Sequence, residues 1–184
     1  LYQKLPAFTK GYLDAIISAQ QQVYGEFLIP GLLNDTILSD MQKSVPYAPN
    51  EDGIETPCYI YANYFLARKL AELDRTAILK KLSAAHQVKL YTNNPTPQLP
   101  KVENMGAIDY YEIMPLVFQH SKINLNITLR SIQKGIPLRA FDIMGSGGFL
   151  LTNYQEDFLN YFVPGEDFIY YSSYEEAETY ADYY

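Results

Sequence analysis

Residues 121–153 read SKINLNITLRSIQKGIPLRAFDIMGSGGFLLTN. This pattern predicts a buried strand, a loop, a short helix opened by Pro137, a glycine turn and a second buried strand. Proline suits the first helical position because its φ is preset and because the amide that it lacks would have no intrahelical partner there. Gly145, Gly147 and Gly148 follow the helix, so we expect them to end it and to permit a close approach to the next strand.

Two charged side chains share one face of this predicted helix. Arg139 and Asp142 are three residues apart, and Asp142 lies about 7 Å along the helix axis from Pro137. A phosphate and the ribose of the same nucleotide are separated by a similar distance, and a carboxylate can accept hydrogen bonds from both hydroxyls of a ribose. The spacing therefore suits phosphates at the amides of Ile136–Arg139 and a ribose on Asp142. The residues alone leave a second interpretation open, an Arg139–Asp142 ion pair on a solvated helix surface.

The composition argues against several classes of protein. The 184 residues suffice for one domain, or for one domain with an appendage, and carry 14 basic against 21 acidic side chains. The net charge of −7 makes nucleic acid or an anionic membrane surface an unexpected partner. Cys58 is the only cysteine and the two histidines are far apart in sequence, so neither a disulfide nor a metal site is predicted. A single cysteine fits a reducing compartment, so we expect a cytoplasmic protein. No segment has the apolar length of a membrane span.

The first part of the chain has helical periodicity. Apolar residues recur at helical spacing from Phe8 to Phe27, and Pro30-Gly31 is expected to close that helix. Further helices are expected over residues 33–41, 58–73 and 75–85, with a proline-rich loop over residues 44–57. Asp74 is a candidate N-cap for the last of these helices. We therefore expect a helical segment over residues 1–74.

Strand patterns alternate with helix patterns in the rest of the chain. Strands are expected over residues 88–92, 123–127, 149–152 and 168–171, with a short extended piece over 102–108. Strands that are apolar on both sides imply a parallel sheet with helices on both faces, and right-handed crossovers would give a Rossmann-like domain over residues 75–184. Ligands of such sheets bind at the carboxyl ends of the strands, where Thr92, Asn93, the loop after Asn126 and the helix at Pro137 would converge.

Four short motifs in this domain resemble the carboxyl-terminal domain of group 1 glycosyltransferases. They read INLNIT at 123–128, GIPLRAFD at 135–142, GSGGFLLTNY at 145–154 and FVPGED at 162–167. The similarity covers roughly residues 75–184, and the closest branch is the CgeB-like, spore-maturation type. It implies one half of a GT-B fold, in which two Rossmann-like domains face each other across a cleft and this half holds a nucleotide-sugar donor.

The resemblance also implies roles for individual residues. Asp142 matches the acid, usually glutamate, that binds the donor ribose, and Arg139 matches the basic residue found just before that acid. The amides near Ile136–Leu138 match the place where the donor diphosphate rests. Many family members carry a second acid eight positions before the ribose-binding one, close to the transferred sugar, and this chain has Lys134 there.

A glycosyl transfer from a nucleoside diphosphate sugar to an acceptor is the activity that the resemblance implies. Helix amides and Arg139 would stabilise the charge that grows on the leaving diphosphate, which needs no metal cofactor. Lys134, Thr92 and Asn93 are further candidate donor contacts. No catalytic base or nucleophile is assigned, because in the family the acceptor side belongs largely to an amino-terminal domain. The chain starts without Met and ends inside a helical pattern, so we expect a piece of a longer protein that binds the donor but transfers little alone.

Two interpretations from other classes stay open. One is a non-catalytic nucleotide-binding module, which the missing second acid favours. The other is a protein-interaction domain on the same fold, in which the helical segment and a surface rich in tyrosine, with 18 in the chain, would hold a partner.

Overall fold

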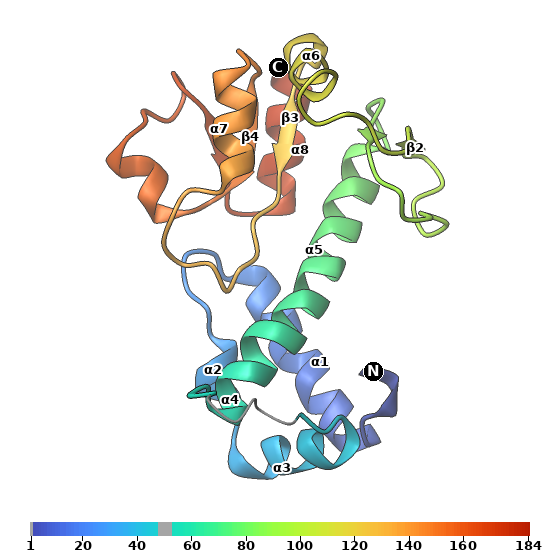
Figure 1. Ribbon diagram of the computed structural model, residues 1–184, viewed down its shortest axis with the longest axis vertical. Coiled ribbons are helices and arrows are strands. Elements are labelled where there is room, and N and C mark those ends of the chain that lie inside the picture. The colour runs from blue at the N-terminus through green and yellow to red at the C-terminus, as the bar shows by residue number, and fades with distance from the viewer. Residues whose placement is uncertain (1, 48–52) are drawn as a thin grey trace. The chain divides into compact units, whose positions relative to one another are not determined.

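The computed structural model describes residues 2–47 and 53–184 (Figure 1). The chain forms two compact units, and each is described by itself. The first contains Leu1–Ala71 together with Leu129–Ser131, and the second contains Glu72–Thr128 together with Ile132–Tyr184.

The described part of the first unit is helical, as the periodicity predicts. A 3-10 turn, Tyr2–Lys4, precedes the helices α1 (Ala7–Gln22), α2 (Ile29–Leu32), α3 (Asp35–Ser44) and α4 (Pro57–Ile60), then the π-helical segment η2 (Tyr61–Leu66) and the start of α5 (Ala67–Leu82). Its core consists of apolar side chains from these elements, among them Leu13, Ile17, Ile29, Ile37, Met41 and Leu66. Asn34 caps α3 by accepting a hydrogen bond from the amide of Ile37 at 3.0 Å, which satisfies one of the amides that a helix start leaves unpaired.

The first helix is shorter than its apolar pattern suggests. It ends at Gln22, and the buried Gln20 side chain fixes the chain that follows: its amide donates to the carbonyls of Val23 and Glu26, and its oxygen accepts from the amide of Leu28. These bonds hold residues 23–28 as a loop. Pro30-Gly31 therefore lies inside α2 and does not close the first helix.

The predicted N-cap at Asp74 is wrong. The helical path from α4 through η2 into α5 has no break there, and Asp74 lies in the interior of α5 with 3% of its surface exposed. Its Oδ1 accepts a hydrogen bond of 2.5 Å from the hydroxyl of Tyr174. Leu70 and Ile78, four residues before and after it on the helix, are both fully buried, so continuing the helix keeps each of them out of solvent.

The second unit is an α/β structure with parallel strands, which confirms the expected fold class. The strands are β1 (Lys89–Leu90), β2 (Glu103–Asn104), β3 (Asn124–Asn126), β4 (Leu150–Asn153) and β5 (Ile169–Tyr171), and the helices after α5 are α6 (Met114–His120), α7 (Leu138–Gly145), the 3-10 helix η3 (Glu156–Asn160) and α8 (Tyr174–Tyr183). β3, β4 and β5 form one parallel sheet in that order, with Asn126 opposite Thr152 and Thr152 opposite Tyr170. β1 and β2 form a separate parallel pair.

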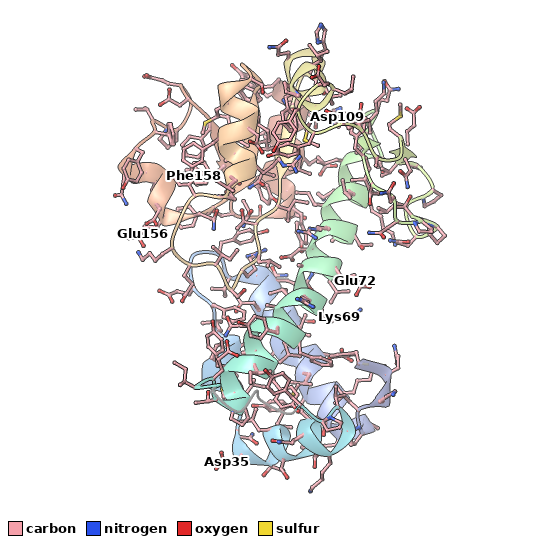
Figure 2. The ribbon with its side chains drawn as sticks, viewed as in Figure 1. Asp35, Lys69, Glu72, Asp109, Glu156 and Phe158 are labelled. Carbon is pink, nitrogen blue, oxygen red and sulfur yellow. The ribbon has the colours of Figure 1, made fainter. Side chains whose placement is uncertain are left out.

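Aromatic and aliphatic side chains join the helices to the larger sheet. The buried cluster consists of Phe118, Ala140, Ile143, Leu150, Phe158 and Phe168. The rings of Phe158 and Phe168 stack with centroids 4.8 Å apart, and Phe158 is labelled in Figure 2. Burying one large side chain of this kind contributes about 1.5–3 kcal/mol, so this cluster holds α6, α7 and η3 against β4 and against Phe168, the residue before β5.

Buried amides fasten the strands to one another beyond their backbone ladder. Asn124 Nδ2 donates to the carbonyl of Phe118 at 2.9 Å, and Asn126 Nδ2 donates to the hydroxyls of Thr128 and Thr152 at 3.0 and 2.9 Å. At the carboxyl end of β4, Asn153 Oδ1 accepts from the amide of Thr128 at 2.7 Å. The asparagines of β3 are thus structural, and Asn126 and Asn153 fix the start of the loop that leads to α7.

The glycine turn after α7 behaves as the sequence predicts. Gly147 has a φ of +75°, and the amides of Gly147 and Gly148 bond back to the carbonyls of Met144 and Ile143, which ends the helix. A Cβ at Gly148 would lie 2.8 Å from Asn124 Nδ2 and 2.9 Å from the carbonyl oxygen of Phe118. Gly148 is therefore the position at which α6, α7 and β3 approach too closely for any side chain.

Gly148→Ala should lower the free energy of unfolding by about 1–3 kcal/mol, because the added methyl must displace a buried amide or a backbone carbonyl. The matched control is Gly145→Ala, three residues earlier, where a Cβ meets nothing within 4 Å. That change should be neutral or stabilise by up to about 1 kcal/mol. The midpoints of urea unfolding measure both, and equal midpoints for the two variants would contradict the close approach at Gly148.

Candidate functional site

The amino-terminal end of α7 is the start of the candidate site. Pro137 has φ −66° and ψ 142°, so it is the N-cap and Leu138 is the first helical residue, one position later than the sequence suggested. The first bond of the turn runs from the amide of Ala140 to the carbonyl of Pro137 at 2.9 Å. The amides before Ala140 precede the intrahelical ladder, and the helix dipole gives this end a partial positive charge.

Arg139 and Asp142 lie together on α7. Arg139 Nε is 3.9 Å from Asp142 Oδ2, which is a loose ion pair of the kind that contributes little on a surface. Nη1 of Arg139 donates to the thioether sulfur of Met114 at 2.7 Å, and the guanidinium lies 5.7 Å from the ring centres of both Tyr110 and Phe118. A thioether is a weak acceptor, so the guanidinium is positioned by weak contacts.

Tyr110 is a member of the site that sequence reasoning missed. Its hydroxyl donates a hydrogen bond to Asp142 Oδ2, and this bond, together with partial desolvation, raises the pKa of the Tyr110 phenol above its ordinary value of 10. Tyr110 precedes Asp142 by 32 residues and lies outside regular secondary structure, so no periodicity relates the two.

The turn that carries Tyr110 is fixed by its neighbour Asp109, which is labelled in Figure 2. Asp109 Oδ1 accepts hydrogen bonds from the amides of Tyr111 and Glu112 at 2.9 and 2.7 Å, and its carbonyl accepts from the amide of Met114 at 3.0 Å. An aspartate that binds the backbone two and three residues ahead stabilises such a turn. The backbone of Tyr110 is therefore anchored while its side chain reaches α7.

The loop before α7 is held by three consecutive side chains at the start of η3. Gln155 Nε2 donates to the carbonyl of Ile132 at 3.0 Å, Glu156 pairs with Lys134, and Asp157 Oδ2 accepts from the amide of Gly135. Gly135 has a φ of +95°, which glycine adopts without strain. The hydrogen bond to Glu156 raises the pKa of Lys134, so its ammonium is charged and paired at neutral pH.

The structure brings together some of the predicted donor contacts. Ile136, Pro137 and Leu138 form the entry to α7, Arg139 and Asp142 lie on the helix itself, and Lys134 lies in the preceding loop. Thr92 and Asn93 follow β1, which pairs with β2 and not with the larger sheet. There Thr92 Oγ1 accepts from the amide of Asn94 at 3.1 Å and stabilises a local turn.

Within residues 2–47 and 53–184, no group of three or more His, Cys, Asp or Glu side chains is arranged to hold a metal ion. None of the helices in those residues combines the length and apolar character needed to cross a membrane.

The fold of the second unit is of the Rossmann-like type that forms half of a GT-B structure, with a helix that begins beyond the carboxyl end of a parallel strand. A family model described as glycosyl transferase-like matches residues 67–184, which is more than half of the chain. The chain belongs to this glycosyl transferase-like family, which confirms the glycosyltransferase resemblance of the four motifs. No curated protein and no solved structure matches the sequence.

Asp157→Ala should release the loop before α7, because the amide of Gly135 loses its carboxylate acceptor. We expect hydrogen exchange at that amide to accelerate about tenfold, the effect of one hydrogen bond to a charged group at an accessible site. Glu156→Ala is the matched control: it removes only the exposed ion pair with Lys134 and should change that exchange rate by less than about twofold. Equal rates in the two variants would show that Asp157 does not hold the loop.

Proposed function

We propose that this chain binds the nucleoside diphosphate sugar donor of a glycosyltransferase, and that the glycosyl group passes to an acceptor held by an amino-terminal domain of a longer protein. The observation that carries the proposal is the arrangement on α7, where Arg139 and Asp142 share the face next to the helix start. Family membership over residues 67–184 supports it. The diphosphate would bind the first amides of α7 and Arg139, and the ribose would bind Asp142.

The chemistry of the leaving group fits this helix end. In the transfer, the bond between the anomeric carbon and the diphosphate oxygen breaks while the acceptor oxygen bonds to that carbon, and negative charge grows on the diphosphate. Helix amides and a guanidinium stabilise such charge, and a fork of N–H donors matches two phosphate oxygens. Met114 Sδ is a weak partner for Arg139, so exchanging it for a phosphate oxygen favours binding. No metal takes part in this scheme.

The proposal also includes the branch of the family, the domain ranges, the cellular location and three further donor contacts. The order of the four motifs supports the CgeB-like branch. We propose that the chain consists of a helical segment over residues 1–74 and a donor-binding domain over residues 75–184. We also propose a cytoplasmic location, because the proposed donor is a nucleotide sugar. Lys134, Thr92 and Asn93 are further proposed donor contacts.

A non-catalytic nucleotide-binding module is the second candidate, and one observation favours it. The position of the second acid is occupied by Lys134, whose ammonium pairs with Glu156. Glycosyl transfer, or slow hydrolysis of the donor, by the longer protein would support the enzyme. Tight donor binding without either reaction would support the module.

Asp142→Ala should weaken nucleoside diphosphate binding by tenfold or more, because the ribose hydroxyls lose a charged acceptor. Isothermal titration of UDP, GDP and ADP into the chain measures this. The control is Glu166→Ala in the exposed turn after η3, which makes the same change of charge at a residue that is not part of the proposed donor site. If none of the three binds the unmodified chain, or if both variants bind equally well, the proposed donor site is wrong.

Arg139→Gln should separate the phosphate from the ribose contacts. The change removes the cation near the helix start, so the affinity for the diphosphate that binds should fall about tenfold while the affinity for its parent nucleoside stays within about twofold. Asp142→Ala should weaken both ligands. Equal losses for diphosphate and nucleoside in Arg139→Gln would contradict a diphosphate contact at Arg139.

A further inference from the structure

The hydroxyl of Tyr110 makes the same kind of bond to Asp142 that a ribose hydroxyl would make. Both are neutral O–H donors to a carboxylate oxygen, and Tyr110 uses Oδ2, the oxygen that also faces Arg139. A ribose diol that binds a carboxylate through two hydroxyls engages both carboxylate oxygens. The tyrosine and the diol therefore require the same atom.

We propose that Tyr110 is an internal competitor of the donor: its hydroxyl occupies Asp142 while the site is empty and leaves when a ribose binds. This inference rests on the proposed donor site. It adds to that site a residue that sets the affinity for ribonucleotides.

The exposure of the pair makes an exchange feasible. The side chain of Asp142 is 31% exposed and Tyr110 is 42% exposed, so the contact lies at the surface and the ring can move without opening the core. The backbone of the turn need not move, because Asp109 holds it through bonds that do not involve the Tyr110 side chain. A χ1 rotation of the tyrosine suffices to free Oδ2.

The same movement would affect Arg139. The guanidinium lies 5.7 Å from the ring of Tyr110, at the range of a weak cation–π contact. When the ring leaves, Arg139 loses one of the contacts that position it beside Met114 and gains freedom to meet a phosphate. Tyr110 thus links the ribose and the diphosphate parts of the site.

The Tyr110 phenol keeps the proton that it donates to Asp142, because that hydrogen bond raises its pKa above the ordinary value of 10. A phenol whose pKa lies above 10 is fully protonated at neutral pH, so the donor hydrogen is present throughout the physiological range. On the alkaline side, the bond to Asp142 would be lost as the pH rises through that elevated pKa. Competition by Tyr110 is therefore a constant property of the site at neutral pH.

Tyr110→Phe tests the competition, because it deletes the hydroxyl and keeps the ring near Arg139. We expect UDP, GDP or ADP, whichever binds the unmodified 184-residue chain, to bind this variant about three- to tenfold more tightly, the effect of removing one competing hydrogen bond at an accessible site. The 2′,3′-dideoxy form of the same diphosphate cannot use the carboxylate, so its affinity should change by less than about twofold.

Two controls separate competition from a structural effect. Tyr111→Phe deletes a hydroxyl from the adjacent exposed residue and should leave both affinities unchanged. In an Asp142→Ala background, Tyr110→Phe should give no gain, because there is no carboxylate left to release.

The outcomes distinguish this inference from the donor site on which it rests. If a diphosphate binds and Asp142→Ala weakens it, but Tyr110→Phe binds it equally or less well, the donor site stands and the competition is wrong. The competition is also wrong if Tyr110→Phe strengthens binding of the dideoxy form as much as binding of the ribose form. If none of the three diphosphates binds the unmodified chain, the donor site is wrong and the inference is wrong with it.

Discussion

The parallel pairing of β3 with β4 is the constraint on which the rest of the second unit depends. Two neighbouring parallel strands need a connection that returns from the carboxyl end of the first to the amino end of the second, and here that connection contains α7. The helix must therefore begin beyond the carboxyl end of β3 and run back along the sheet. Its positive end lies at that edge as a result of the topology alone.

The side chains around this connection fix where the helix begins. Asn126 and Asn153, at the ends of β3 and β4, both form hydrogen bonds with Thr128. These bonds fix the direction in which the loop leaves the sheet. Gln155 and Asp157 hold the loop further along, and Pro137 then sets the first turn. Such fixed positions favour ligand binding, because the affinity is lower when binding must first order the groups that contact the ligand.

Local signals account for the part of the fold that could be predicted from sequence. Pro137 and the glycines at 145–148 mark the two ends of α7, and the strand that follows it, β4, begins after Phe149 with the apolar pair Leu150-Leu151. The interpretations that failed depend on distant or non-periodic side chains. Asp74 is held by Tyr174, 100 residues later, and the first helix ends early because of the bonds made by the buried Gln20 side chain. Tyr110 was missed for the same reason, since only the folded chain brings it to Asp142.

Two aspartates in this unit accept a hydrogen bond from a tyrosine, and their surroundings decide what the bond does. Asp74 is 3% exposed, so losing the hydroxyl of Tyr174 would leave a desolvated carboxylate without that donor, and water cannot easily replace it. Asp142 has a side chain that is 31% exposed, so water or a ligand hydroxyl can take the place of Tyr110 at a small cost in free energy. The first pair is therefore structural and the second is exchangeable. A carboxylate that is satisfied without a ligand, yet can change its partner, has the property that the proposed nucleotide site requires.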